Sequence, residues 1–248
     1  MRKIHIVGNW KMNQTMEDIT AFTKGLESLS GHDCEAWIAP QFIHIPYLQK
    51  CADKISFLKV GAQNCSAELS GAFTGDSSLV ALKEMGTHFA IIGHSERRAI
   101  FGEGHELLNK KTHQCLEIGM TAIFCVGETL EQREAGITNK IIEEQILEGL
   151  KGVPASKTDK LIIAYEPVWA IGTGKTATPD QAQEVHAFIR TLLAEKLSYD
   201  SESIVILYGG SVKPGNVAEL LSQKDIDGGL VGGASLKAED FKALCTNR

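Results

Sequence analysis

The sequence has no long apolar segment, no excess of positive charge and no closely spaced pair of cysteines. Uncharged stretches such as residues 85–95 and 203–212 fall far short of the roughly 18 apolar residues that a membrane-spanning helix requires. The 25 Lys and Arg residues are outnumbered by 31 Asp and Glu residues, which gives a net charge of -6. Because nucleic acids and anionic membranes attract basic surfaces, we expect neither as a partner.

The six cysteines are spread along the chain and never lie closer than ten residues apart. No CxxC pair is therefore present for zinc binding or redox chemistry, and we expect reduced, mostly buried thiols. Met1, Arg2 and Lys3 lead directly into a short apolar run, without the longer apolar region of a signal peptide. These features predict a cytoplasmic protein.

Eight short apolar runs, most of them rich in β-branched residues, recur along the chain. They read as continuous apolar segments, which is typical of strands buried on both faces of a parallel sheet. The predicted strands are residues 4–7, 36–39, 57–60, 89–92, 121–126, 161–165, 204–208 and 228–231.

The segments between these runs carry helical patterns. Val185, Ile189 and Leu192 share one face of a helix, and Thr178 with Gln181 forms a capping box that predicts its start. No linker rich in Pro or Ser and no run of like charge marks a domain boundary. The pattern favours an α/β fold, a single (β/α)8 barrel domain spanning residues 1–248 with a parallel eight-stranded core, over an open doubly wound sheet.

Polar and charged residues follow most of the predicted strands directly. In a (β/α)8 barrel, reactive groups collect at the C-terminal ends of the strands, so we expect these residues to share one face. The candidates, in chain order, are Asn9, Lys11, Gln63, Asn64, His94, Ser95, Glu96, Glu166, Ser211, Gly232 and Gly233.

The glycine-rich segment 172–176 invites a nucleotide-binding interpretation. A P-loop is excluded because Trp169 stands where the first glycine of GxxxxGK[ST] is required. A dinucleotide site is disfavoured because six residues separate the end of the strand from Gly172. An uncharged, glycine-containing tip between Pro167 and Gly174 instead indicates a mobile lid that closes over a ligand and excludes water.

The candidate residues also indicate a reaction class. Backbone amides on the loops after the seventh and eighth strands are common phosphate-binding positions in such barrels. Glu166 suits a base that removes a carbon-bound proton, while His94 and Lys11 can polarise a carbonyl and stabilise an oxyanion. No HExxH motif or carboxylate and histidine cluster indicates a catalytic metal, and this chemistry needs no redox cofactor.

Six motifs, GNWKMN, GAFTGD, GHSERR, YEPVWAIGTGKT, YGGSV and VGGASLK, resemble those of the triosephosphate isomerase family, in order, from Gly8 to Lys237. The resemblance implies cofactor-free interconversion of glyceraldehyde 3-phosphate and dihydroxyacetone phosphate in glycolysis and gluconeogenesis. Asp76 stands where the family usually has Glu, and Val126 where Ile is common. Neither departure touches the implied catalytic set.

The resemblance also assigns a role to each motif residue. Glu166 is implied as the base that moves a proton between C1 and C2, and His94 as a neutral electrophile whose imidazolium form the positive end of a helix disfavours. Lys11 is implied to supply positive charge, Asn9 a hydrogen bond, and Glu96 a carboxylate near Lys11. The implied phosphate ligands are the amides of Gly172, Ser211, Gly232 and Gly233.

Residues 63–77 form a long connection without helical periodicity, and connections of this length are usually functional or disordered. Their apolar residues include Leu69 and Phe73. The resemblance places this loop in the pocket of a second copy of the chain, beside Met12 and Asn13, with Thr74 reaching towards Asn9 and Glu96. It therefore implies a homodimer whose two active sites each depend on the other subunit.

Two other functions remain open at the level of the sequence. A sugar-phosphate sensor on the same barrel would need the phosphate loops but not Glu166 and His94 together. An aldolase or epimerase is a neighbouring alternative, although an aldolase would want a Schiff-base lysine inside the barrel and Glu166 stands at the end of the sixth strand.

Overall fold

The computed structural model describes residues 2–29, 32, 34–171 and 176–247. All eight predicted runs are strands of one sheet whose paired neighbours run parallel. The largest shift from prediction is in the first strand, which extends to Asn9. The strands are β1 His5–Asn9, β2 Glu35–Ala39, β3 Leu58–Val60, β4 Phe89–Ile92, β5 Thr121–Val126, β6 Leu161–Tyr165, β7 Val205–Tyr208 and β8 Gly228–Val231.

The sheet closes on itself where β3 meets β4. In the order β3-β2-β1-β8-β7-β6-β5-β4 these two strands are the ends, and an isolated parallel bridge between Ala62 and Ala90 joins them. The amide of His88 donates to the carbonyl oxygen of Val60 at 2.9 Å, and the amide of Ile91 donates to that of Ala62 at 2.9 Å. The (β/α)8 barrel is therefore confirmed, and an open doubly wound sheet is excluded.

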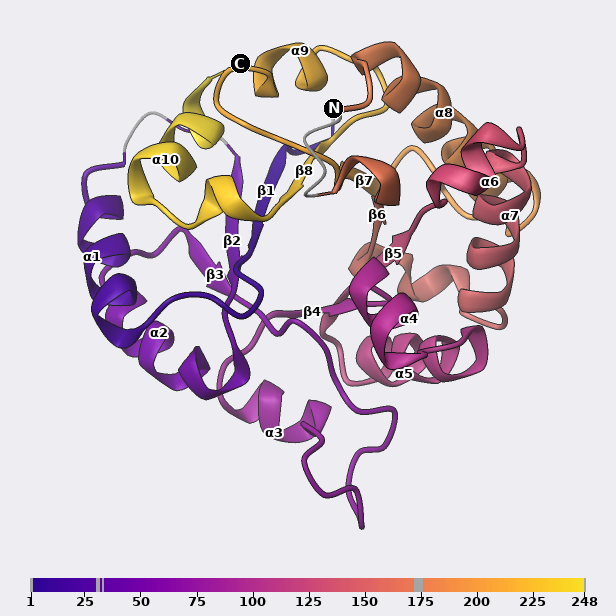
Figure 1. The fold of residues 1–248 in the computed structure, drawn as a ribbon. Helices are drawn as coiled ribbons and strands as arrows, with labels where there is room; N and C mark the ends of the chain where they lie inside the picture. The colour runs from indigo at the N-terminus through magenta and orange to yellow at the C-terminus, as the bar shows by residue number, and fades with distance from the viewer. Residues whose placement is uncertain (1, 30–31, 33, 172–175, 248) are drawn as a thin grey trace.

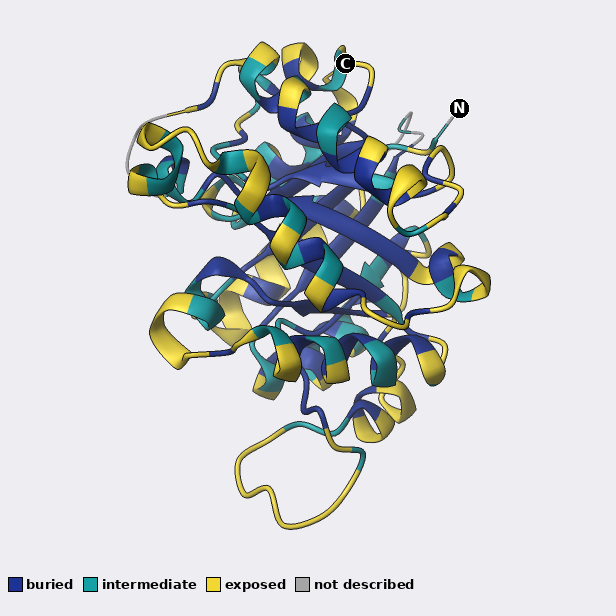
Figure 2. Ribbon diagram, turned by 90° about the vertical axis from the view of Figure 1, so that its right-hand side faces the viewer, coloured by how far each residue is buried: buried dark blue, intermediate teal, exposed yellow. Residues whose placement is uncertain are grey.

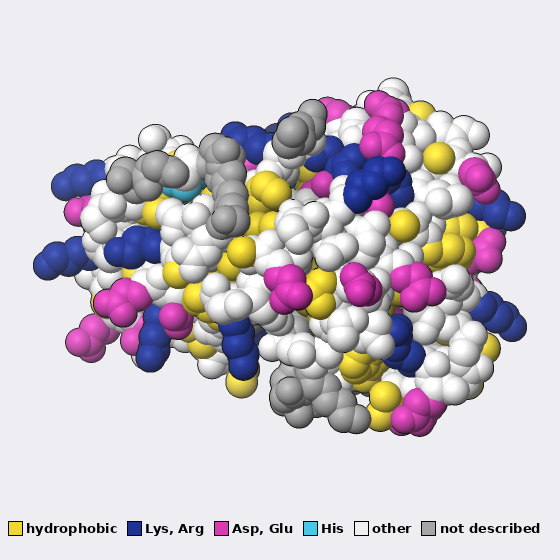
Figure 3. Space-filling view, turned by 90° about the horizontal axis from the view of Figure 1, so that it is seen from above, with side chains coloured by type: hydrophobic (Ala, Val, Ile, Leu, Met, Phe, Trp, Pro, Cys, Tyr) yellow, Lys and Arg dark blue, Asp and Glu magenta, His cyan; other side chains and the backbone are white. Residues whose placement is uncertain are grey.

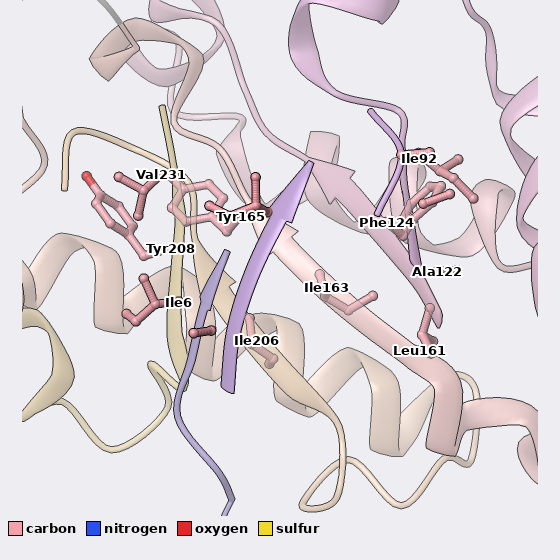
Figure 4. Close-up of a cluster of buried hydrophobic side chains, with 14 of the residues drawn as sticks. Ile6, Ile92, Ala122, Phe124, Leu161, Ile163, Tyr165, Ile206, Tyr208 and Val231 are labelled. Atoms are coloured by element: carbon pink, nitrogen blue, oxygen red, sulfur yellow. The ribbon is translucent and has the colours of Figure 1, made fainter. Parts of the chain in front are cut away.

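Successive side chains of each strand point alternately into the barrel and out towards the helices. In β6, Ile162 and Ala164 belong to the cluster that fills the barrel, whereas Leu161, Ile163 and Tyr165 pack in the cluster beneath the helices. Figure 4 shows side chains of this outer cluster, from Ile6 on one side to Phe124 on the other. Both faces of the sheet are buried, which explains the continuous apolar runs.

The helices surround the strands (Figure 1). The predicted capping boxes at Thr129 and Thr178 are both present, and Thr15 with Asp18 forms a third that was not predicted. The described α-helices are α1 Met16–Leu26, α2 Ile45–Ala52, α3 Leu79–Glu84, α4 Ser95–Phe101, α5 His105–Glu117, α6 Leu130–Glu134, α7 Thr138–Gly149, α8 Pro179–Glu195, α9 Val217–Leu221 and α10 Ala238–Thr246.

The surface carries charges of both signs. On the face seen in Figure 3, Lys and Arg side chains are interspersed with Asp and Glu side chains. Among the described residues, no helix combines the length and the apolar character needed to cross a lipid bilayer.

Residues 63–77 leave the end of β3 and project from the barrel before α3 begins (Figures 1 and 2). The base of this loop is closed by Ser66, whose amide donates to the carbonyl of Ser77 at 2.8 Å and whose hydroxyl donates to Asp76 at 2.8 Å. Phe73, near the tip, is 49% exposed. The loop therefore presents an aromatic side chain on a defined base, far from the rest of the fold.

The connection between β7 and β8 is tied to α8 by buried charges. The guanidinium of Arg190 donates to Asp225 at 2.7 Å and to Asp227 at 2.9 Å. One turn earlier on α8, the Nδ1 of the fully buried His186 donates to the backbone carbonyl of Asp225 at 3.1 Å. Its Nε2 has no hydrogen-bond partner within the described part of the chain. Burial lowers the pKa of His186 to about 4.

We expect this histidine to make the fold sensitive to acid. Above a pH of about 6.5 the imidazole is neutral in both states, so its burial carries no protonation penalty. As the pH falls from 6.5 towards 4, the unfolded chain binds a proton that the folded chain rejects, and stability is lost. In the variant His186→Asn, whose amide keeps a donor near the Nδ1 position, the loss of unfolding free energy between pH 7 and pH 5 should shrink by about 2 kcal/mol.

Urea unfolding of both proteins at the two pH values measures this difference. Any cavity or packing cost of the substitution is the same at both pH values and cancels. Equal losses in the two proteins would show that His186 is not the group responsible.

Candidate active site

The C-terminal ends of the strands enclose a cavity of about 590 Å³. Seven of the predicted site residues line it, although they come from five different strand ends, whereas Gln63, Asn64 and Ser95 do not line it. Glu96 lies in a neighbouring cavity, and Gly172 lies outside the described residues, as do residues 173–175 of the predicted lid. The predicted residues that line the large cavity are Asn9, Lys11, His94, Glu166, Ser211, Gly232 and Gly233.

Glu166 follows β6 directly and is 2% exposed. One carboxylate oxygen lies 2.9 Å from the Nε2 of His94, and the other accepts the backbone amide of Ser95 at 2.9 Å. A side chain at Gly209 would place its Cβ 2.7 Å from the Cγ of Glu166, so only glycine leaves room for this carboxylate. The site thus holds a buried anion between two hydrogen-bond donors.

His94 is the N-cap residue of α4. Its Nδ1 accepts the backbone amide of Glu96 at 3.2 Å and therefore carries no proton. The Nε2 then carries the proton of the neutral ring and donates to Glu166. The N-terminus of α4 thus fixes which ring nitrogen faces the cavity.

The charge of Glu166 changes the expected electrostatics of this ring. Burial lowers the pKa of His94, but the adjacent Glu166 carboxylate and its hydrogen bond raise it by more, and the net pKa is raised. The end of α4 and the Glu166 carboxylate therefore act on this ring in opposite directions: the Glu96 amide on Nδ1 favours the neutral ring, as the resemblance implies, whereas the carboxylate that follows β6 raises the pKa.

Lys11 follows β1 in a left-handed backbone conformation, with a φ of 51°. The side-chain amide of Gln63 donates to the carbonyl of Lys11 at 2.8 Å, and the Lys11 amide donates to Asn9 at 3.1 Å. Its ammonium group lies 2.6 Å from the carboxylate of Glu96, as the resemblance implies. Left-handed backbone is costly for a residue with a side chain, and these contacts stabilise it.

Sequence reasoning found Gln63 as a strand-end residue but did not find its contact with Lys11. It also missed Glu128, which follows β5 and is completely buried. One Glu128 oxygen accepts hydrogen bonds from the Trp169 indole at 2.9 Å and from the Tyr165 hydroxyl at 3.1 Å, and Arg133 lies 3.2 Å away. Glu128 therefore holds the segment that leads into the predicted lid. An acidic residue two positions after the end of the predicted strand was the available signal.

Ser211 and the pair Gly232 and Gly233 line the same cavity as the reactive side chains. Ser211 follows β7, and the two glycines follow β8, where Gly233 begins a short 3-10 turn. Glu166 and His94 come from the other half of the barrel, after β6 and β4. The cavity therefore has reactive side chains from one set of strands and glycine-rich backbone from another. Within the described ranges, no group of three or more His, Cys, Asp or Glu side chains could hold a metal ion.

Comparison with known proteins agrees with this geometry. The family model described as triosephosphate isomerase matches residues 4–248. The proteins named triosephosphate isomerase from Trichlorobacter lovleyi and Endomicrobium trichonymphae are 51% and 49% identical to this chain over 247 and 246 residues, and each alignment covers 98% of both sequences. A relative of the same name from Carboxydothermus hydrogenoformans is 49% identical over 249 residues, again with 98% coverage of both sequences. The chain therefore belongs to the triosephosphate isomerase family.

Proposed function

We propose that the protein interconverts D-glyceraldehyde 3-phosphate and dihydroxyacetone phosphate by proton transfer through an enediolate, without a cofactor. The observation that carries the proposal is the 2.9 Å contact between Glu166 and the Nε2 of His94, two side chains that are both buried. A protein that only sensed a sugar phosphate would have no need for a buried base beside a buried donor. The proposal extends to a cytoplasmic location, to glycolysis and gluconeogenesis, and to one domain over residues 1–248.

The phosphate of the substrate binds at the glycine-rich side of the cavity. Ser211, Gly232 and Gly233 line the cavity there and offer backbone amides for a phosphate, whereas the further ligand that the resemblance implies, Gly172, lies outside the described residues. The side chain of Lys11 runs close to this side, because its Cε would lie 3.8 Å from a Cβ at Gly232, and Lys11 lines the same cavity as His94 and Glu166. A three-carbon chain that extends from the phosphate towards His94 places its carbonyl oxygen beside Lys11 and His94, and its reacting carbons beside Glu166.

In the forward step, Glu166 takes a proton from C1 of dihydroxyacetone phosphate while the electron pair of that C–H bond forms the C1–C2 double bond. The negative charge that develops on the C2 oxygen is stabilised by the Nε2–H of His94 and by Lys11. Glu166 returns the proton to C2, and the exchange of one proton between the two oxygens completes the aldose. Atoms and charge balance without any oxidant or reductant.

Substrate binding also changes the surroundings of His94. The carboxylate that raises the pKa of this ring must leave Nε2 and the Ser95 amide to reach a carbon of the substrate. Burial then lowers the pKa, and the amide on Nδ1 favours the neutral ring. His94 therefore acts on the substrate as a neutral donor, which matches the high pKa of an enediol better than an imidazolium does.

We also propose that the protein is a homodimer held together by residues 63–77. Lys11, His94 and Glu96 line a second cavity of about 380 Å³ whose rim carries three strongly exposed apolar side chains, Met12, Ile43 and Phe101. The projecting loop offers the exposed Phe73 as a matching apolar group. Insertion of this loop from a second copy would bury both surfaces beside Lys11, and Thr74 of that copy would approach Asn9 and Glu96.

The variant Glu166→Gln tests the assignment of the base. It preserves side-chain volume but removes the proton acceptor, so we expect kcat to fall by about 100-fold or more, with little change in phosphate affinity. Steady-state kinetics in both directions gives kcat and KM, and inhibition by inorganic phosphate gives the affinity. The control is Glu195→Gln, an exposed position on α8, which should match the unsubstituted protein. Retention of more than a tenth of kcat would exclude Glu166 as the base.

Removal of residues 70–75, with the gap closed by a short polar turn, tests the dimer. Because the loop loses its apolar tip, we expect a monomer in sedimentation experiments and sharply lower activity, since Lys11 and Glu96 lose the contacts that the partner supplies. Phe73→Asp, which keeps the loop length and places a charge at the tip, should weaken the dimer in the same direction. A shortened protein that stays dimeric, or a monomer with full kcat, would contradict the proposal.

A further inference from the structure

The end of the barrel opposite the active site holds a separate cavity of about 190 Å³. It is lined by residues at or just before the N-terminal ends of β4, β5 and β6, by Lys83 of α3, by Trp37 of β2 and by Lys59 of β3. Inside the barrel, Trp37 stacks on Phe89 with ring centroids 4.9 Å apart. Trp37 therefore lines the cavity and also packs against the interior of the barrel.

The lining of this cavity has charge of one sign only. Lys59, Lys83 and Lys160 contribute three ammonium groups, His88 adds an imidazole, and no Asp or Glu lines it. This contrasts with the chain as a whole, whose net charge is -6. A concave site that is lined by several cations and by no carboxylate has a positive potential, which attracts an anion.

Two of the three ammonium groups have no acidic partner among the described residues. Lys83 donates to the backbone carbonyl of Ile118, which leaves its charge uncompensated, and the ammonium of Lys160 makes no ion pair or hydrogen bond with the described residues. Gly119 adjoins Lys83, and a Cβ there would lie 3.8 Å from the ammonium nitrogen. The small residue therefore leaves space in front of this cation.

Lys59 is held in a fixed position. Its ammonium lies 5.1 Å from the centre of the Trp37 ring and 3.0 Å from Glu35, and the Trp37 indole donates to the same carboxylate at 3.1 Å. Ordering this long side chain before a ligand arrives lowers the entropy cost of binding. Glu35 is shared with Lys3, so one carboxylate serves two ammonium groups.

The geometry points to a binding site for a phosphate-type oxyanion at this end of the barrel, formed by Lys59, Lys83 and Lys160. The ligand chemistry is a small tetrahedral anion, either free inorganic phosphate or the phosphoryl group of a larger molecule. A second cavity of about 230 Å³ shares Lys59 and Lys160 but is also lined by Glu35 and Asp159. These carboxylates repel an anion, so the phosphoryl group of a ligand binds in the cavity that is lined by the three lysines. The neighbouring cavity can take only an uncharged part of a larger ligand. This inference does not depend on the proposed isomerase activity.

The test titrates the purified protein with inorganic phosphate and, in a separate arm, with a nucleoside monophosphate. The ring NMR signals of His88 are the readout, because this residue lines the cationic cavity and not the active site. We expect a saturable shift of these signals in the unsubstituted protein. In Lys83→Gln/Lys160→Gln the affinity should fall by about tenfold or more, because two charge-assisted contacts are lost. The kcat of this variant should be unchanged.

The matched control is Lys24→Gln/Lys140→Gln, which removes the same charge from exposed positions on α1 and α7. Binding in this control should equal that of the unsubstituted protein. A shift with phosphate alone identifies the free ion as the ligand, and tighter binding of the nucleotide identifies a phosphoryl group on a larger molecule. The inference is overturned if the His88 signals do not move with either probe, or if both double variants lose affinity equally.

Discussion

The 2.9 Å contact between Glu166 and His94 is the constraint on which the site depends. Burying a carboxylate is costly unless donors surround it, and here the donors are the imidazole and the Ser95 amide. Those donors come from the end of β4, whereas the carboxylate comes from the end of β6, and β5 lies between them. Only strands held in fixed register can bring these groups within hydrogen-bond distance, so the closed barrel is a condition of the chemistry.

The polar groups of the site have partners within the protein. Lys11 forms an ion pair with Glu96, and the carboxylate of Glu166 accepts hydrogen bonds from His94 and from the Ser95 amide. A phosphorylated substrate replaces these internal partners by its own oxygens, which supplies new acceptors to the same donors. On the proposed mechanism, this exchange offsets the cost of separating the internal pairs when Glu166 becomes free to act as the base.

Most of the fold followed from sequence because local and global signals agree. Apolar runs gave the eight strands, and the boxes at Thr129 and Thr178 marked helix starts, since capping depends only on residues three apart. The positions of Asn9, Lys11, His94 and Glu166 followed from the barrel, which collects strand ends on one face.

The features that sequence did not yield are contacts between distant segments. The hydrogen bonds from Gln63 to the carbonyl of Lys11 and from Trp169 to Glu128 join residues that are far apart in the sequence. A local sequence pattern carries no information about such contacts. The raised pKa of His94 was missed for the same reason, because its cause is a carboxylate on another strand end. The cationic cavity at the opposite end of the barrel likewise consists of lysines that are unremarkable one at a time.

The most direct test of proton transfer by a single buried base is incubation of the protein with dihydroxyacetone phosphate in deuterated water. The measurement is the exchange of the carbon-bound hydrogens of the substrate for deuterium. We expect the protein to introduce one deuterium stereospecifically at C1 while glyceraldehyde 3-phosphate appears, because one carboxylate works from one face of the enediolate. Both products can be followed by proton NMR. Absence of exchange, or exchange without stereospecificity, would contradict the assignment of this site as a cofactor-free isomerase.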